Sequence, residues 1–335
     1  MKLLTCVGYY ATGSGAAKDF CCEFDNCKNF GNYEIRFPQD PCGLSDLEYN
    51  IVENNHRHNT SNAIKEFREL MKFYNGCWYT KRYRKFFGDD FLEVTEKYIQ
   101  ELVELESNCW WHYDQYKKGP AFYFMDILYG KFTAKFRKEG RMSLLKNKEK
   151  SYYTYMDKEK FYEITKRFTS NLFKDYCEED LLMVDQLVSP SNVNRYLNYF
   201  ENLKVIIVDR DPRDLYIAAR ENYQEGIIPA KNVEEFSKWY EITRKHRKFE
   251  KINLEKVLFL NFEDMIYKYD KTAKKIMEFI GLDSKDQSRK FEKFDPKKSI
   301  RGTKLIEKFP IYKVDVEYIE KNLKEYLYNY DKEEI

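Results

Sequence analysis

The sequence predicts an α/β fold built around a central, mostly parallel β-sheet. Short apolar runs that are typical of strands alternate along the chain with longer stretches of helical periodicity. One run, Lys204–Asp209 (KVIIVD), is almost continuously β-branched and apolar. Such a run is typical of a strand buried on both faces of a parallel sheet.

The predicted strands are the short apolar runs Leu3–Gly8, Tyr33–Phe37, Leu181–Asp185, Lys204–Asp209 and Val257–Asn261. Helical patterns lie between them, at Ser14–Phe24, Ser61–Tyr74, Asp89–Asn108, Lys158–Tyr176, Asn192–Phe200, Val233–Phe249, Asp264–Ile280 and Val316–Tyr328. The stretch 60–180 is mainly helical and separates the early strands from the late ones. We therefore expect a single domain over residues 1–335, with a large helical insertion at about 60–180 that caps the site.

Composition excludes several classes of protein. The chain has 58 Lys+Arg and 56 Asp+Glu, a net charge of +2, which argues against a uniformly basic nucleic-acid-binding surface. Hydrophobic residues at 43% and aromatic residues at 17% exclude intrinsic disorder. There is no run of about 18 apolar residues to predict a membrane-spanning helix. The first residues are too short an apolar stretch for a signal peptide, so we expect a cytoplasmic protein.

The cysteines do not indicate a metal site. There are eight of them, and none is paired in a CxxC spacing. Cys21, Cys22 and Cys27 lie close together, but no further Cys or His completes a zinc-binding set. We expect reduced thiols that serve as small core residues, and no bound metal.

Glycine is scarce and clustered at the start of the chain. Glycine accounts for 13 of the 335 residues, about 4%, whereas ~7% is usual. Even so, Gly8, Gly13 and Gly15 all fall within the first fifteen residues. A strand, a glycine turn and a helix in succession point backbone N–H groups at a phosphate. Gly8 and Gly13 have the spacing of a GxxxxGK[ST] loop, but Ser14 and Gly15 stand at its Lys and Ser/Thr positions. The loop predicts an anion cradle that lacks the usual contacts to nucleotide triphosphate and Mg²⁺, or alternatively a simple structural turn.

A second anion site is predicted where the strand Lys204–Asp209 ends. Pro212 is suited to the start of the following helix. Arg210 and Arg213 would then emerge at the carboxyl edge of the sheet, where open α/β sheets bind ligands. Two separate anion sites suit a ligand with phosphates at both ends. The alternative is that these arginines pair with the neighbouring Asp209, Asp211 and Asp214.

The segment Arg210-Asp-Pro-Arg-Asp214 resembles the 3′-phosphate-binding motif of sulfotransferases that use 3′-phosphoadenosine-5′-phosphosulfate (PAPS). Three further stretches are similar to this family in the same order. Thr12-Gly13-Ser14 resembles its 5′-phosphosulfate loop, Val257–Asp264 its late strand, and Phe294–Gly302 the loop that closes over the nucleotide. The resemblance covers residues 3–20 and 181–304 and is closest to bacterial carbohydrate sulfotransferases. It implies a P-loop-like, three-layer α/β fold.

The resemblance also implies PAPS as the donor substrate and a set of residues that bind it. They are Ala11, Thr12, Gly13, Ser14, Gly15, Ala16, Arg210, Arg213, Ala218, Arg301 and Gly302. Two of them depart from the family pattern, because Ala11 replaces a Lys or Arg and Ala218 replaces a Ser. Lys18, one turn into the helix, is the candidate replacement for the missing cation. No metal is implied.

Sulfuryl transfer needs a base that deprotonates the acceptor hydroxyl. In the family it follows the strand that precedes the arginine motif, which implies Asp185 here. His58 and Glu48 are the further catalytic candidates, as groups that orient the acceptor hydroxyl. Each also has a purely structural interpretation, Asp185 as a loop or cap residue and His58 as part of a surface loop.

The helical middle is where acceptor recognition is expected. Trp110-Trp111-His112-Tyr113 is suited either to stacking on sugar rings or to packing in a core. Residues 131–150 hold eight Lys/Arg and two acids, which predicts either a solvated surface or a patch that attracts a polyanionic or lipid-linked acceptor. The function expected is sulfuryl transfer to a carbohydrate or other hydroxyl acceptor. A P-loop-like kinase and a catalytically inactive nucleotide-binding protein stay open as alternatives.

Overall fold

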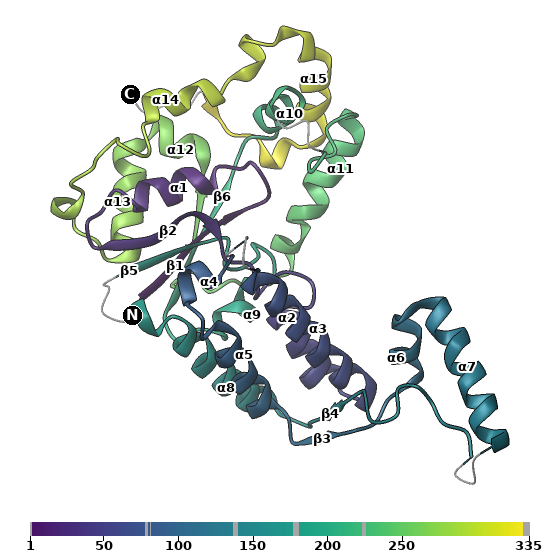
Figure 1. The fold of residues 1–335 in the computed structure, drawn as a ribbon. Coiled ribbons are helices and arrows are strands. Elements are labelled where there is room, and N and C mark those ends of the chain that lie inside the picture. The colour runs from purple at the N-terminus through teal and green to yellow at the C-terminus, as the bar shows by residue number, and fades with distance from the viewer. Residues whose placement is uncertain are drawn as a thin grey trace. The chain divides into compact units, whose positions relative to one another are not determined.

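The computed structural model describes residues 2–77, 80, 82–136, 140–176, 181–222 and 226–330 (Figure 1). The chain divides into two compact units. Residues 1–39 and 173–335 form the first, here called the sheet unit, and residues 40–172 form the second, here called the helical unit. The helical unit begins about 20 residues earlier than the insertion predicted at 60–180.

The sheet unit contains five parallel strands in the order β2-β5-β1-β6-β7. These strands are β1 (Lys2–Gly8), β2 (Cys27–Glu34), β5 (Leu181–Asp185), β6 (Leu203–Asp209) and β7 (Val257–Asn261). Its helices are α1 (Ser14–Cys21), α9 (Val193–Leu197), α10 (Pro212–Glu221), α11 (Val233–Arg244), α12 (Phe262–Tyr267), α13 (Tyr269–Ile280), α14 (Pro296–Ser299) and α15 (Lys313–Asn322). The predicted α/β class and parallel sheet are confirmed.

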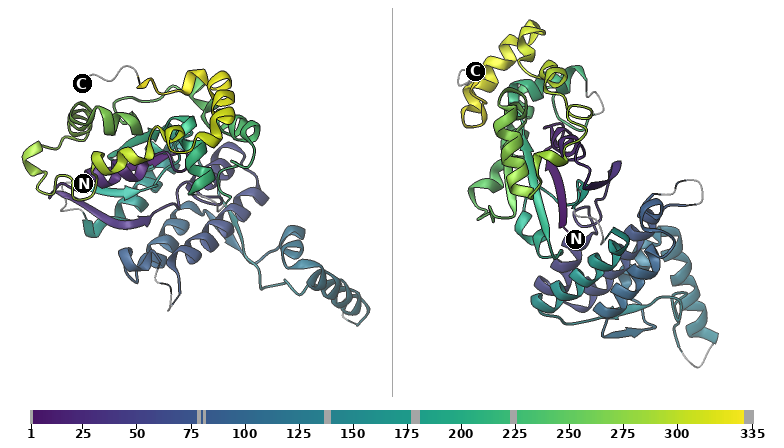
Figure 2. Two further views of the ribbon diagram at one scale, coloured as in Figure 1. Left: turned by 90° about the horizontal axis from the view of Figure 1, so that it is seen from above. Right: turned by 90° about the vertical axis from the view of Figure 1, so that its left-hand side faces the viewer.

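Both faces of the sheet are buried, as the apolar strands predict. On one face Leu4, Cys6 and Ile206 pack with α1 and α13, which Figure 2 shows alongside the strands. On the other face Leu3 and Val205 are also buried. Burial on both faces explains why these strands are apolar at nearly every position.

The order of the strands defines where a ligand can bind. After β1 the chain turns to the side of the sheet that holds β2 and β5, whereas after β6 it continues to β7 on the opposite side. β1 and β6 are adjacent, with Leu3 paired to Leu203 and Gly8 to Val208. Loops that leave in opposite directions open a crevice at the carboxyl ends of such a strand pair. The glycine loop follows β1 and Arg210 follows β6, so both flank this crevice.

The helical unit is built mainly from three helices that pack on one another, α3, α5 and α8 (Figure 1). A short antiparallel ribbon of two strands, β3 and β4, carries the helices α6 and α7. The elements are α2 (Leu44–Glu48), α3 (Arg57–Asn75), α4 (Arg84–Phe87), α5 (Phe91–Leu102), β3 (Leu105–Ser107), α6 (His112–Lys117), α7 (Gly119–Phe136), β4 (Ser151–Tyr153) and α8 (Lys158–Leu172). None of the helices in the described part of the chain combines the length and the apolar character needed to cross a bilayer.

Several predicted elements differ from those observed. The helix expected over Asp89–Asn108 ends at Leu102 and is followed by the strand β3, and the helix expected over Val316–Tyr328 ends at Asn322. The strand expected at Tyr33–Phe37 corresponds to β2, which ends at Glu34. β2 lies at the edge of the sheet and has several exposed polar residues, so it does not form an apolar run in the sequence. The apolar Ile35 lies beyond it, although its N–H still donates to the Asp185 carbonyl at 3.0 Å. The helix expected over Asp264–Ile280 is interrupted at Lys268, whose φ of −124° and ψ of 42° are not helical.

Candidate functional site

The glycine loop between β1 and α1 is held by close packing. A Cβ on Gly8 would lie 2.2 Å from Thr12 Oγ1 and 3.0 Å from the Val208 carbonyl. Gly13 has a φ of +98°, and a Cβ there would lie 2.5 Å from the Phe262 ring. At Gly15 a Cβ would meet no described atom within 4 Å. Two glycines therefore shape the loop, and the third leaves open space beside the start of α1.

Thr12 fastens the loop to the neighbouring strand. Its hydroxyl donates to the Val208 carbonyl at 2.7 Å and accepts from the Tyr9 N–H at 3.0 Å. Thr12 is buried, so its hydroxyl is engaged within the protein. Tyr10 and Ala11 have φ of 67° and 51°, in the left-handed region that residues other than glycine seldom adopt. Through these two hydrogen bonds, Thr12 fixes the conformation of the glycine loop.

The first turn of α1 offers unpaired donors. Within the described residues no oxygen accepts from the backbone N–H groups of Ser14 and Gly15, and Gly13 supplies no side-chain cap. The Ala16 N–H, in contrast, donates to the Gly13 carbonyl at 3.0 Å. The Ser14 hydroxyl accepts from Gln186 Nε2 at 3.0 Å. A helix N-terminus with free N–H groups is suited to an anion.

Arg210 connects three parts of the predicted site. Its Nη1 donates to the Ala11 carbonyl at 3.1 Å, and its Nη2 donates to the Gly302 carbonyl at 2.5 Å. The guanidinium lies 5.3 Å from the Phe262 ring centroid, and the residue is only 8% exposed. Its Nε is buried and has no hydrogen-bond partner among the described residues. Arg210 therefore joins the glycine loop to the segment at Gly302 and keeps one donor unsatisfied.

Glu263, the second residue of α12, adds a buried carboxyl near this arginine. Its Oε1 accepts from the Asp211 N–H at 2.8 Å, and its Oε2 has no partner among the described residues. Burial raises the pKa of Glu263 to about 8. The carboxyl is therefore mostly protonated at neutral pH and does not cancel the charge of Arg210. Sequence reasoning missed this residue, because its environment comes from distant segments.

Arg213 is engaged elsewhere. It binds both carboxylate oxygens of Asp211, at 2.7–3.2 Å, and donates to Glu320 at 2.9 Å and to the Tyr328 carbonyl at 3.0 Å. These partners raise the pKa of Arg213 against the opposing effect of burial. The pairing with a neighbouring aspartate that the sequence left open is thus observed for Arg213 and not for Arg210.

The remaining predicted donor-binding residues lie in different surroundings. Ala218 is buried among the apolar residues shared by α10, α11 and α15. Arg301 is exposed. Lys18, the proposed replacement cation, is buried, with its Nζ 2.9 Å from Asn32 Oδ1 and 3.9 Å from Asp185. The structure thus brings together the glycine loop, Arg210 and Gly302, and it leaves Ala218 in a core.

A cavity of about 610 Å³ opens beside the glycine loop. The loop residues that line it are Gly8, Tyr9, Tyr10, Ala11 and Ser14, and the facing segments contribute Glu34, Arg36, Gln39, Gln186, Ser189, Pro190, Ser191, Ile227, Ile242, Thr243 and His246. A smaller cavity of about 310 Å³ is lined by both signs of charge. Its lining residues are Arg210, Arg247 and Lys268, the acids Asp209, Asp211 and Asp264, Asn261, and residues 325–329. Because Arg210 also binds the Ala11 carbonyl, one hydrogen bond links the walls of the two cavities.

His246 lines the larger cavity and was not predicted. Its Nε2 lies 2.8 Å from the Tyr9 hydroxyl, and its Nδ1 lies 2.9 Å from Glu250. Burial lowers the pKa of His246, so the neutral imidazole dominates at neutral pH. The only signal in the sequence is a carboxylate four residues after a histidine on a helical pattern.

A buried ionic cluster packs against the Tyr9 ring. Asp209 binds Arg244 and Arg247, each at 2.8 Å, and both guanidinium groups lie within 5 Å of the Tyr9 ring centroid. Burial alone would raise the pKa of Asp209, but the two arginines outweigh it and the pKa is lowered. This cluster fixes the wall of the cavity and neutralises the acid next to Arg210.

Asp185 ends β5 at the carboxyl edge of the sheet. Its Oδ1 is buried without a partner among the described residues. Burial raises the pKa of Asp185 to about 6, although Lys18 opposes that shift. Asp185 is not among the residues that line the larger cavity, but Gln186, which follows it, is. The group therefore has the protonation behaviour of a base without direct contact to that space.

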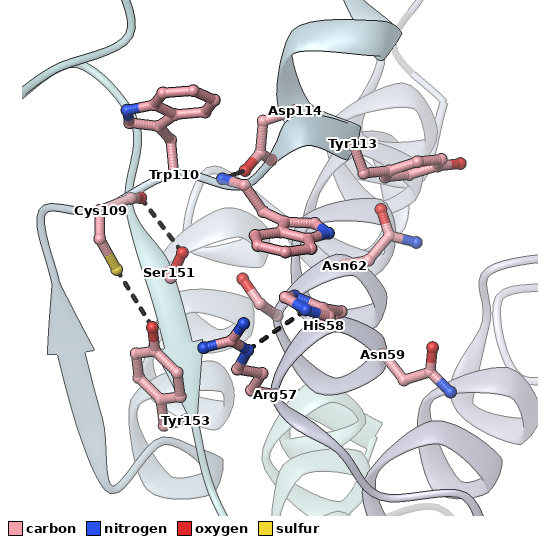
Figure 3. Close-up of a pocket in the computed structure, with 12 residues that line it drawn as sticks. Arg57, His58, Asn59, Asn62, Cys109, Trp110, Tyr113, Asp114, Ser151 and Tyr153 are labelled. Atoms are coloured by element: carbon pink, nitrogen blue, oxygen red, sulfur yellow. Dashed lines mark hydrogen bonds between the residues drawn. The ribbon is translucent and has the colours of Figure 1, made fainter. Parts of the chain in front are cut away.

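The other two catalytic candidates belong to the helical unit. Glu48 is fully buried, accepts from the Tyr162 hydroxyl at 2.9 Å and lies 3.7 Å from Lys158. His58 stacks on Trp111 at 4.1 Å and accepts from Arg57 at 3.2 Å (Figure 3). Figure 3 shows His58 in a cavity of about 590 Å³ together with Asn59, Asn62 and Tyr113. Its pKa is lowered by desolvation and by Arg57.

Comparison with known proteins adds little to this geometry. No protein-family model matches the chain, and no curated protein matches it. One similar solved structure is the sulfotransferase STF1 from Mycobacterium tuberculosis H37Rv. It is 9% identical, with 91% of this chain and 76% of that chain covered and a TM-score of 0.32. So distant a likeness supports no statement about function.

Proposed function

We propose that this protein is a sulfotransferase that moves a sulfuryl group from PAPS to a hydroxyl acceptor. One observation carries the proposal: Arg210 joins the glycine loop to Gly302 and keeps a buried donor free. Three segments that are distant in the chain and resemble donor-binding motifs thus meet at one guanidinium. The unpartnered Nε of Arg210 is a donor that a bound anion could satisfy.

The two anion sites suit the two ends of the donor. The free N–H groups at Ser14 and Gly15 would hold the 5′-phosphosulfate, and Arg210 would hold the 3′-phosphate. In the transfer the acceptor oxygen forms a bond to sulfur while the bond from sulfur to the bridging oxygen breaks. The products are the sulfated acceptor and adenosine 3′,5′-bisphosphate, and the acceptor proton passes to a base.

Two groups of the sheet unit are suited to be that base. Asp185 has a pKa of about 6 and an unpartnered buried oxygen, so it is mostly ionised at neutral pH and able to accept a proton. His246 lines the cavity with its Nδ1 2.9 Å from a Glu250 oxygen, and burial favours its neutral form, which can accept a proton. We assign the role to Asp185 and keep His246 as the competing candidate.

We further propose that the helical unit binds a carbohydrate acceptor in the cavity around His58. Trp111 and Tyr113, which line this cavity, are 40% and 47% exposed, and Asn59 and Asn62 contribute amide groups to the same lining. Aromatic faces beside hydrogen-bonding side chains suit the apolar faces and hydroxyls of sugars.

The kinase alternative is less well supported, because Ser14 and Gly15 replace the side chains that contact the β/γ-phosphates and Mg²⁺. The inactive nucleotide-binding protein stays open, because Ala11 leaves the loop without a cation. Donor binding separates the first alternative from the proposal. Turnover separates the second.

The proposal is tested by calorimetry with adenosine 3′,5′-bisphosphate, ATP and GTP. We expect binding of the bisphosphate and a loss of about 10- to 100-fold in the Arg210→Ala variant, the usual contribution of a charged hydrogen bond. Arg210→Lys keeps the charge and controls for folding. Arg220→Ala, which removes an arginine bound to the Ala230 and Lys231 carbonyls, is the matched control. Tight ATP binding without bisphosphate binding would refute the proposal.

A further inference from the structure

Helix α7 in the helical unit has its polarity reversed. The residues that it buries are Asp126, Gly130 and Thr133, which recur at the spacing of one helix face. Its large apolar side chains are turned outward. Helices of globular proteins normally bury the apolar face and expose the polar one.

The buried polar face is fully engaged, which fixes the rotation of the helix. Asp126 accepts from Gln115 Nε2, from the Ser143 hydroxyl at 3.0 Å and from the Leu144 N–H. The Thr133 hydroxyl accepts from the Met142 N–H at 2.9 Å. These contacts hold α7 against α6 and residues 142–144. The opposite face of the helix is therefore exposed.

The outward face is a continuous apolar row. Phe124, Leu128, Phe132 and Phe136 recur every four residues, and each is 49–65% exposed. Met125 lies beside this row and is exposed to a similar extent. Phe132 and Phe136 contact each other, with ring centroids 4.8 Å apart. An apolar patch of this kind marks a surface that binds a partner or a membrane.

The exposed charged residues of α7 itself are both positive. Lys131 and Lys135 are exposed on the same helix, whereas its only acid, Asp126, is buried. Residues 131–150 hold eight Lys/Arg and two acids in the sequence. The exposed surface of α7 therefore combines aromatic side chains with positive charge. Those are the two features that favour the interface of a bilayer with anionic headgroups.

We propose that α7 binds the surface of an anionic membrane, lying in the plane of the interface with the row Phe124–Phe136 among the lipids. Its 18 residues and two lysines suit a surface position. A second copy of the chain is a poorer occupant. A symmetric dimer through this face would gather four lysines, Lys131 and Lys135 from each copy, around one interface, which costs electrostatic energy. This inference does not depend on the proposed enzymatic function.

The test is co-sedimentation of the full-length protein with vesicles of phosphatidylcholine, with and without phosphatidylglycerol. We expect binding to the anionic vesicles, weakened at least about 30-fold by the double substitution F124S/F132S. K131Q/K135Q should weaken binding roughly 10- to 30-fold on anionic vesicles. The matched control is L254S/I311S, which removes two exposed apolar side chains elsewhere.

Three results would overturn the proposal. One is a wild-type protein that does not co-sediment with anionic vesicles. Another is a F124S/F132S variant that binds them as well as the wild type and L254S/I311S do. The third is light scattering that shows a dimer in solution which F124S/F132S converts to a monomer, because the face would then be covered by a second copy.

Discussion

Arg210 and Arg213 are three residues apart but differ in their hydrogen-bond partners. Arg213 is satisfied by Asp211, Glu320 and the Tyr328 carbonyl. The Arg210 guanidinium donates to the Ala11 and Gly302 carbonyls and lies over the Phe262 ring, and its Nε has no hydrogen-bond partner among the described residues. A guanidinium that already holds two carboxylates offers little attraction to a further anion, whereas one held by neutral carbonyls keeps its full charge. The chemistry proposed here therefore rests on Arg210.

The acid–base role assigned to Asp185 predicts a pH dependence. Its pKa of about 6 is raised, so the carboxyl gains a proton as pH falls through 6 and loses its capacity as a base. We expect kcat/KM for sulfuryl transfer to fall below about pH 6 and to level off above it. Asp185→Asn should lower kcat by about 10²–10⁴ without changing affinity for the bisphosphate.

His246→Gln serves as the matched control for this assignment, because the pKa of His246 is also displaced and the pH profile alone does not separate the two groups. Turnover that survives in Asp185→Asn and disappears in His246→Gln would transfer the role to the histidine.

At the scale of elements, the glycine loop shows why the scarce glycines stand where they do. Gly13 combines a φ of +98° with a Cβ position only 2.5 Å from the Phe262 ring, whereas Gly15 has neither constraint. One residue therefore fixes the path of the chain, and the other leaves space beside it.

This difference predicts that Gly13→Ala destabilises the fold by about 2 kcal/mol or more, since a left-handed alanine costs about 1–2 kcal/mol before any displacement of the ring. Gly15→Ala should change the free energy of unfolding by less than about 0.5 kcal/mol. Urea unfolding measures both. Equal destabilisation by the two substitutions would show that the packing against Phe262 does not constrain the loop.

Other elements show which secondary structure can be predicted from sequence patterns and which cannot. The strands β1, β5, β6 and β7 were predicted closely, because burial on both faces produces an apolar run. The edge strand β2 was displaced, since its exposed side interrupts the pattern. Helix α7 was not predicted, because its short polar face is the buried one and apolar residues cover most of the rest, so the sequence lacks the usual pattern of an amphipathic helix.

At the scale of the molecule, the proposed donor site is assembled from segments almost 300 residues apart in the chain. The glycine loop, the end of β6 and the turn at Gly302 converge on Arg210. Their convergence follows from the parallel pairing of β1 with β6, which brings both loops to one edge.

A single ligand bound there should protect all three segments together. We expect adenosine 3′,5′-bisphosphate to slow amide hydrogen exchange in residues 9–16, 209–213 and 299–304, because binding raises the free energy of local opening. Helix α13 serves as the internal reference, and Arg210→Ala should abolish the effect. Protection confined to the glycine loop would contradict the assembly of one site from three segments.

The α/β class and the positions of four strands could be predicted from the sequence, because they depend on local periodicity. Residue spacing also marked the segments that are proposed to bind anions. Only the tertiary structure decided which arginine is free, since Glu320 and Tyr328 reach Arg213 from more than 100 residues away. It also buried Glu263 beside Arg210, placed His246 in the cavity wall and turned the apolar face of α7 outward. Charge pairing and burial depend on neighbours in space, and no local pattern in the chain encodes those neighbours.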